Sequence, residues 1–112
     1  MSSARIESLR GQIGGPRDGA LLRFALAGAL LDAGNASDAA AAARAALGFD
    51  ASYTAAWKLL GKALSDAGDK SAAIAAYRKG IQAAEAGGDI QAGKEMQVFL
   101  RRLERARNGY SP

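Results

Sequence analysis

Lys58 and Lys62 are the charged residues whose spacing is best suited to hold a ligand. They are four positions apart, so in a helix their side chains lie on one face, one turn from each other. Two ammonium groups in that arrangement can hold one carboxylate through charge-assisted hydrogen bonds. The alternative is that both lysines are solvated surface residues. The face of the helix that carries them decides between the two interpretations.

Residue types for catalysis and metal binding are scarce. The chain has no histidine and no cysteine, so the usual zinc ligands, general bases, thiolates and disulfides are missing. The carboxylates of Glu7, Glu85, Glu95 and Glu104 lie apart in the sequence, and no glycine-rich phosphate loop is present. We therefore expect no enzymatic activity, no cofactor and no bound metal.

Positive charge is concentrated at residues 94–107, where five Lys or Arg stand against Glu95 and Glu104. Such a stretch can bind RNA or another polyanion through its phosphates, with an affinity that falls steeply with salt. Cations near a helix C-terminus are, however, also favoured by the helix dipole. We expect a solvated face, keep weak polyanion binding as the alternative function, and do not expect nucleic acid to be the main partner.

The helices that are expected to position these residues come from a repeat in the sequence. Residues 23–47 and 57–81 match at an offset of 34, a period typical of helix-turn-helix repeat arrays. No stretch alternates with a period of two, so the chain is expected to be all-α. Eleven pairs are identical: Leu26/Leu60, Ala29/Ala63, Leu30/Leu64, Asp32/Asp66, Ala33/Ala67, Gly34/Gly68, Ser37/Ser71, Ala39/Ala73, Ala41/Ala75, Ala42/Ala76 and Arg44/Arg78.

Apolar spacing and turn residues predict five helices in residues 18–110. Repeat one (20–53) has a helix capped by Asp18 and a second helix over 36–47, joined by a turn in which Gly34 takes the left-handed conformation. Residues 48–50 then interrupt the helical pattern. Repeat two (54–87) begins after a cap at Ser52, and its second helix lies between residues 69 and 86. A last helix (89–107) begins at Asp89 and covers the open face of repeat two with Met96, Phe99, Leu100 and Leu103.

The stretches 57–64 and 73–77, Trp-Lys-Leu-Leu-Gly-Lys-Ala-Leu and Ala-Ile-Ala-Ala-Tyr, resemble the motif of the tetratricopeptide repeat (TPR) family. The resemblance implies a right-handed superhelix of antiparallel helix pairs. Residues 94–103 also look like the closing helix of a group of small uncharacterised bacterial proteins of this family. Repeat one departs from the motif, with Arg23, Ala27 and Ala43 in place of the aromatic residues and glycine. The packing residues of the motif are Leu26, Leu30, Gly34, Trp57, Leu60, Gly61, Leu64, Ala73 and Tyr77.

In the family, the first helices of successive repeats line a concave groove that holds a peptide or a helix of a partner. The positions that correspond here are Leu21, Phe24, Gly28, Leu31, Ala55, Lys58, Leu59, Lys62 and Ser65. We predict partner contacts from Phe24, Leu31, Lys58, Leu59, Lys62 and Ser65, although Phe24 is equally suited to core packing against the N-terminal segment. The carboxylate clamp of chaperone adaptors in the family is absent, because its positions hold Phe24, Gly28, Leu59, Asp89 and Gly93.

Residues 1–17 are either a frayed leader or a short docking helix. Ile6, Leu9 and Ile13 share one helical face, and Gly14-Gly15-Pro16 ends it. Two repeats bury little apolar surface, so something further must complete the core. Three alternatives are the last helix alone, the last helix together with residues 3–13 folded back, and self-association. We favour the second option for a monomer, with a weak homodimer as the alternative.

The sequence thus predicts an all-α TPR domain that acts as a protein interaction scaffold and adaptor. Its expected partner is a peptide or a helix of another protein, and this partner is acidic if the lysines bind it. No segment approaches the ~20 apolar residues of a membrane span. We expect no membrane contact and a cytoplasmic location.

Overall fold

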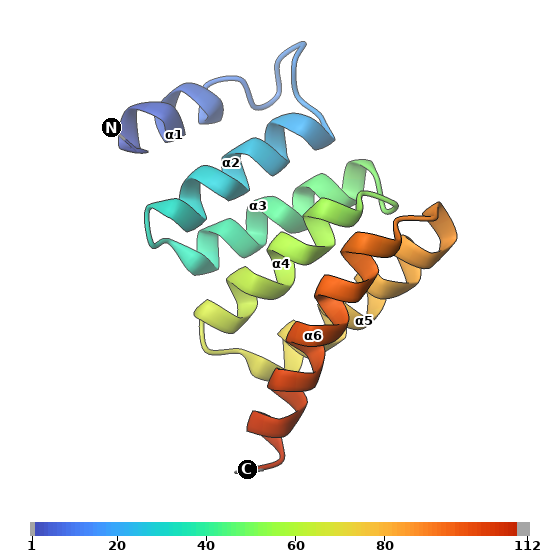
Figure 1. Cartoon of the computed structure of the whole chain (residues 1–112). Coiled ribbons are helices and arrows are strands. Elements are labelled where there is room, and N and C mark those ends of the chain that lie inside the picture. Colours follow the sequence, from blue (N-terminus) through green and yellow to red (C-terminus); the bar gives the residue numbers. More distant parts are fainter. Residues whose placement is uncertain (1, 110–112) are drawn as a thin grey trace.

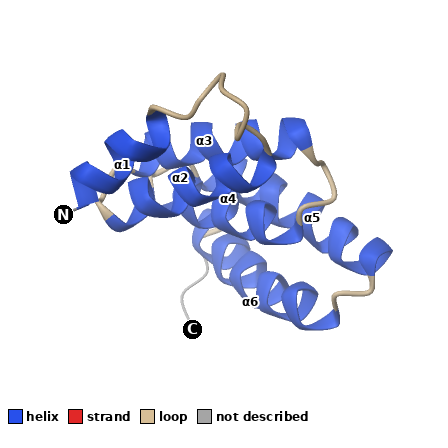
Figure 2. Cartoon of the chain, turned by 90° about the horizontal axis from the view of Figure 1, so that it is seen from above, coloured by secondary structure: helices blue, strands red, loops and turns tan. Residues whose placement is uncertain are grey.

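The computed structural model describes residues 2–109, which form six α-helices and no strand (Figures 1 and 2). Each helix packs against the next along the chain, from α1 at one end of the molecule to α6 at the other. The helices are α1 (Ser2–Arg10), α2 (Ala20–Asp32), α3 (Ala36–Phe49), α4 (Thr54–Asp66), α5 (Lys70–Gly87) and α6 (Ile90–Arg107).

The pairs α2/α3 and α4/α5 are the two repeats, and they turn in the same way. Gly34 and Gly68 take φ of 84° and 88°, a left-handed conformation that glycine adopts without steric cost. The following N–H groups then donate to carbonyls of the preceding helix, from Asn35 to Leu30 and from Asp69 to Leu64, each at 2.9 Å. The predicted role of Gly34 is confirmed.

The helices form an inner and an outer layer. In the inner layer α4 touches both α2 and α6, whereas in the outer layer no Cα of α3 lies within 8 Å of a Cα of α5. Closer approach on one side than on the other curves the molecule, so the inner layer is the concave side.

Glycine allows the closest contacts of the core. A Cβ at Gly61 would lie 2.5 Å from ring carbons of Tyr77, and one at Gly80 would lie 2.5 Å from Sδ of Met96 and 2.7 Å from Cβ of Trp57. Met96 is completely buried where α6 crosses α5. The last helix therefore covers repeat two as predicted.

The N-terminal segment is a docked helix. Ile6 is buried and Leu9 partly so, and α2 is the helix that α1 contacts. The predicted end of this helix was wrong. It ends at Arg10, because the chain tightens into turns from Gly11 on, and this leaves Ile13 41% exposed.

Asp18 is not the predicted helix cap. Gly19 occupies the cap position of α2 without a side-chain hydrogen bond. The carboxylate of Asp18 instead accepts hydrogen bonds from the Arg23 guanidinium at 2.8 and 3.0 Å and from the Gly14 N–H at 2.9 Å. A carboxylate engaged by these donors is unavailable to the helix terminus, and it ties the long α1–α2 loop to α2.

Ser52 is also not a cap. Its hydroxyl donates to Oδ1 of Asp50 at 2.6 Å, and Tyr53 takes the cap position of α4. The predicted break at Gly48 lies inside α3, which continues to Phe49. The starts of the last two helices follow prediction, and their boundary residues are caps: Asp69 and Asp89 accept from backbone N–H groups of α5 and α6 at 3.1 and 3.2 Å.

Gly80→Ala should destabilise the protein by about 1–3 kcal/mol, because the new methyl group would overlap Met96 and the Cβ of Trp57. The measurement is urea unfolding followed by circular dichroism. Gly48→Ala is the control, since a Cβ there meets nothing within 4 Å and alanine has the higher helix propensity. Equal stability of the two variants would contradict the tight α5–α6 contact.

The Asp18–Arg23 ion pair should make stability depend on pH. Hydrogen bonds from Arg23 and Gly14 hold the pKa of Asp18 well below its usual range. The unfolded chain therefore binds the proton first, so this stabilisation is present above about pH 4 and is lost as pH falls. The free-energy difference between wild type and Asp18→Asn should shrink from pH 7 to pH 3 in urea unfolding. Asp32→Asn corrects for the change in net charge, and a difference independent of pH would refute the prediction.

Candidate functional site

The six predicted partner contacts lie on α2 and α4, the first two helices of the concave layer. Three of them are apolar and half-buried: Phe24, Leu31 and Leu59 pack against the core, and the Phe24 ring lies 5.0 Å from that of Tyr53. The most exposed apolar residue of this face is Leu21, at 73%. The apolar contacts thus serve the fold on one side and offer only part of their surface to a partner.

Lys58 and Lys62 are directed to different acidic residues. Nζ of Lys58 lies 3.0 Å from Oε2 of Glu95 on α6, whereas Nζ of Lys62 lies 3.4 Å from Oδ2 of Asp66 in its own helix. The two ammonium groups therefore do not share an anion. The first pair bridges α4 and α6 across the concave face, and this long-range contact was not foreseen from the sequence.

A cleft of about 290 Å³ opens between α4 and α6. Its apolar surface comes from Tyr77, Phe99 and Leu103, and the Tyr77 and Phe99 rings stack with centroids 5.7 Å apart. Its polar lining consists of Lys62, Ser65, Asp66 and Arg102. Two predicted contacts, Lys62 and Ser65, are thus brought together with residues that were predicted to be core or solvated surface.

Tyr77 keeps its proton at neutral pH. Burial, and secondarily the negative charge of Asp66, raise the pKa of Tyr77 to about 12. The phenol therefore stays uncharged in the cleft lining, as both hydrogen-bond donor and acceptor.

A constant offset of 34 residues, carried on from α4 to α6, assigned the wrong α6 residues as equivalents of α4 positions. The helices α2, α4 and α6 begin at Ala20, Thr54 and Ile90, so the second interval is 36 residues and not 34. The difference arises because α5 has 18 residues and α3 has 14, while the connection after α5 (88–89) is two residues shorter than the connection after α3 (50–53). With the interval of 36, Gln91 and Glu95 replace Asp89 and Gly93 as equivalents of the α4 positions Ala55 and Leu59. The apolar stripe of α6, aligned on the helix start, was the signal that could have placed Phe99 beside α4.

No group of three or more potential metal ligands occurs among the described residues. Within the same part of the chain, no helix is long and apolar enough to cross a membrane. Both acidic residues within the basic stretch on α6 are paired with cations of other helices: Oε2 of Glu104 lies 2.7 Å from Nη2 of Arg78 on α5, and Glu95 pairs with Lys58 on α4. Of the basic residues of the stretch, Arg102 lines the cleft.

Known proteins are similar to this chain in sequence and fold. The chain is 48% identical over 102 residues to the TPR repeat-containing protein PA0015 of Pseudomonas aeruginosa, covering 91% of this chain and 97% of that protein. The chain belongs to the tetratricopeptide repeat family. No protein-family profile matches it.

Two solved structures agree with the TPR assignment. The solution structure of protein BPP2914 from Bordetella parapertussis has a TM-score of 0.78 and 42% identity, over 90% of this chain and 88% of that one. The Sgt2 TPR domain from Aspergillus fumigatus has a TM-score of 0.80 and 29% identity, over 99% of this chain and 74% of that one. MamA, at 21% identity and a TM-score of 0.69, shares the fold. The TPR fold is in general that of a protein interaction scaffold, and TPR proteins are typically not enzymes.

The Lys58–Glu95 pair should hold α6 against α4. Lys58→Glu and Glu95→Lys each place like charges across the contact and should destabilise the protein by about 0.5–1 kcal/mol, because both side chains are partly exposed. The double variant Lys58→Glu/Glu95→Lys restores opposite charges and should recover most of that loss. Urea unfolding of the four proteins measures the coupling. Purely additive effects would show that apolar contacts alone dock α6.

Proposed function

We propose that this TPR protein is an adaptor that binds a peptide or a helix of a partner protein on the concave face of α2, α4 and α6. The observation that carries the proposal is the cleft between α4 and α6, which joins an apolar surface to polar residues on the face where Lys62 and Ser65 were predicted to act. Convergent polar groups around an apolar depression are typical of binding sites.

The cleft is suited to a side chain of a longer ligand. Its volume of about 290 Å³ is at the lower end of small-molecule pockets, which begin near ~300 Å³. A large apolar residue of the partner would stack on Tyr77 and Phe99, while the rest of the segment follows the concave face toward Leu59, Leu31 and Phe24. These partly buried residues would add apolar contact along its length.

Charged residues around the cleft would determine which apolar segments of a partner bind. Arg102 has no ion pair among the described residues and is the first cation available to a partner carboxylate. Lys58 and Lys62 can bind an acidic group by exchanging Glu95 or Asp66 for it. Because surface ion pairs contribute only ~0–1 kcal/mol, such an exchange costs little.

The test compares two neighbouring arginines on α6. Partners are isolated on the wild-type protein from lysate of the source organism, identified by mass spectrometry, and titrated against purified variants. Arg102→Glu should weaken binding by about tenfold, which corresponds to ~1.4 kcal/mol. Arg101→Glu makes the same charge change on an exposed residue that does not line the cleft, and it should leave the affinity unchanged.

Two results would refute the cleft as the binding site. Full affinity in Arg102→Glu, with circular dichroism unchanged, would show that the partner binds elsewhere. Equal losses in both arginine variants, together with binding that disappears at moderate salt and includes generic RNA, would instead favour the polyanion-binding alternative for the basic helix.

A further inference from the structure

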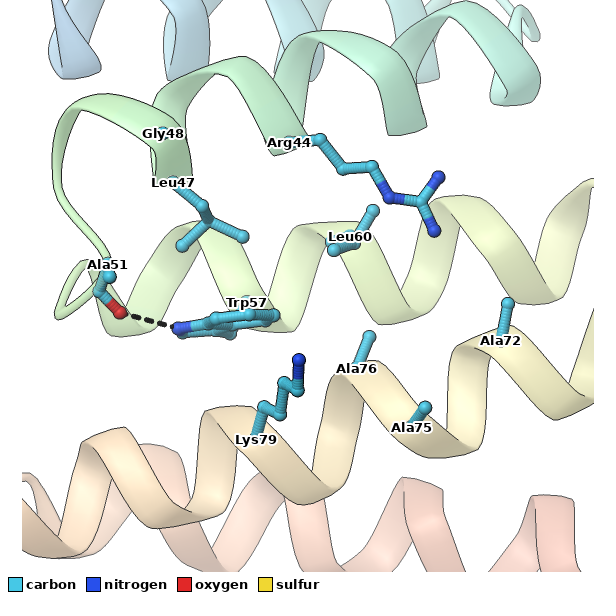
Figure 3. Close-up of a pocket in the computed structure, with 10 residues that line it drawn as sticks. All are labelled: Arg44, Leu47, Gly48, Ala51, Trp57, Leu60, Ala72, Ala75, Ala76 and Lys79. Atoms are coloured by element: carbon cyan, nitrogen blue, oxygen red, sulfur yellow. Dashed lines mark hydrogen bonds between the residues drawn. The ribbon is translucent and has the colours of Figure 1, made fainter.

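A second groove lies on the outer face, between α3 and α5 (Figure 3). Its volume is about 540 Å³, larger than that of the concave cleft. Trp57 and Leu60 of α4 are seen between the two outer helices, and Arg44 and Lys79 reach in from α3 and α5. The complete lining is Arg44, Leu47, Gly48, Ala51, Trp57, Leu60, Ala72, Ala75, Ala76 and Lys79.

Small residues and helix separation keep the groove open. The α5 wall consists of Ala72, Ala75 and Ala76, and α3 and α5 do not approach within 8 Å between Cα atoms. The indole of Trp57 is fixed in place, since its Nε1–H donates to the Ala51 carbonyl at 2.8 Å and Gly80 lies against its Cβ. A preformed apolar surface of this kind binds without a cost for rearrangement.

The charge of the groove is positive and uncompensated within the lining. No acidic residue lines it, and neither Arg44 nor Lys79 has an ion pair among the described residues. Their helix neighbours three and four positions away are Ala40, Ala41, Leu47, Gly48, Ala75, Ala76, Gln82 and Ala83, none of which is charged. Lys79 lies over the Trp57 ring, with Nζ 6.0 Å from its centroid. The lysines of the concave cleft region, in contrast, are paired within the chain.

We propose that this outer groove is a second protein-binding site, and that its occupant is an acidic segment of a partner protein. One large apolar side chain of the segment enters between α3 and α5 and packs on Trp57 and Leu60. Carboxylates on either side of that residue pair with Arg44 and Lys79. Trp57 is the single aromatic residue of the lining, so the groove favours an apolar side chain over a nucleotide base, which would require more stacking and polar partners than the groove offers.

The first experiment is a selection from a displayed library of random twelve-residue peptides. It is run in parallel on the wild type, on Ala75→Leu and on Ala41→Leu. Ala75→Leu fills the groove, whereas Ala41 is the residue of α3 equivalent to Ala75, is also exposed, and lies outside the groove. Peptides enriched on the wild type and on Ala41→Leu, and not on Ala75→Leu, should carry a large apolar residue flanked by Asp or Glu.

The second experiment locates the enriched peptide and tests its charges. Trp57 is the single tryptophan of the chain, so its indole N–H gives one identifiable NMR signal in the groove. That signal should shift on titration. Arg44→Glu/Lys79→Glu should weaken binding at least about tenfold, and Arg17→Glu/Arg101→Glu, with the same change in net charge at exposed sites outside the groove, should not.

Several outcomes would overturn the proposal. These are a failure to enrich any peptide that discriminates wild type from Ala75→Leu, enriched peptides without acidic residues, or an unchanged Trp57 signal. Binding of random single-stranded RNA with the same dependence on Ala75, without peptide binding, would replace the acidic peptide by a nucleic acid. Because none of these variants touches the concave cleft, failure here and failure of the adaptor proposal are distinguishable.

Discussion

Close packing of α4, α5 and α6 at two glycines is the constraint on which the rest of the structure depends. The chain is 49% apolar but only 6% aromatic, so much of its core is alanine, which buries little area for each residue. Such helices are stable only if their backbones come close enough for the few large side chains to fill the remaining space. Gly61 and Gly80 allow this, because Tyr77 lies directly on the first, and Met96 with Trp57 directly on the second.

The same packing creates both grooves. Tyr77 covers Gly61 with one part of its ring and lines the concave cleft with another. Trp57 packs its Cβ on Gly80 and shows its indole to the outer groove. The residues that the TPR motif uses for packing therefore also form part of two opposite surfaces. A substitution at either aromatic position would change stability and binding together, so the residues that separate the two effects lie around the grooves and not at their centres.

Features that depend on local spacing were predictable from the sequence. The 34-residue period predicted the paired helices, the turn residues predicted the left-handed conformation of Gly34, and the apolar stripe of residues 96–103 predicted the helix that covers repeat two. Features that depend on which charged side chains meet were not. The Lys58–Glu95 pair requires the interval of 36 residues between α4 and α6, and Asp18 was assigned to the nearest helix start although Arg23 engages it. The outer groove was not predicted because small side chains create it, and a run of alanines in the sequence indicates only a high helix propensity.

Helix α6 contributes both to the stability of the domain and to the charge and shape of its surface. Met96 completes the core, Glu95 pairs with Lys58, and Arg102 lines the cleft beside Phe99 and Leu103, so residues 95–103 of one helix contribute to packing, to charge compensation and to the proposed binding site. The compensation has a functional consequence. With Lys58 and Lys62 already paired, Arg102 is the cation of the cleft that a partner carboxylate would meet, so the affinity of the proposed segment would come largely from apolar contact in the cleft. In the outer groove neither Arg44 nor Lys79 has an ion pair in the described part of the chain, so both charges would add to apolar contact there. The two surfaces share helices α4 and α5, with α6 completing the concave cleft and α3 completing the outer groove, and they differ in how many of their cations are already paired within the chain.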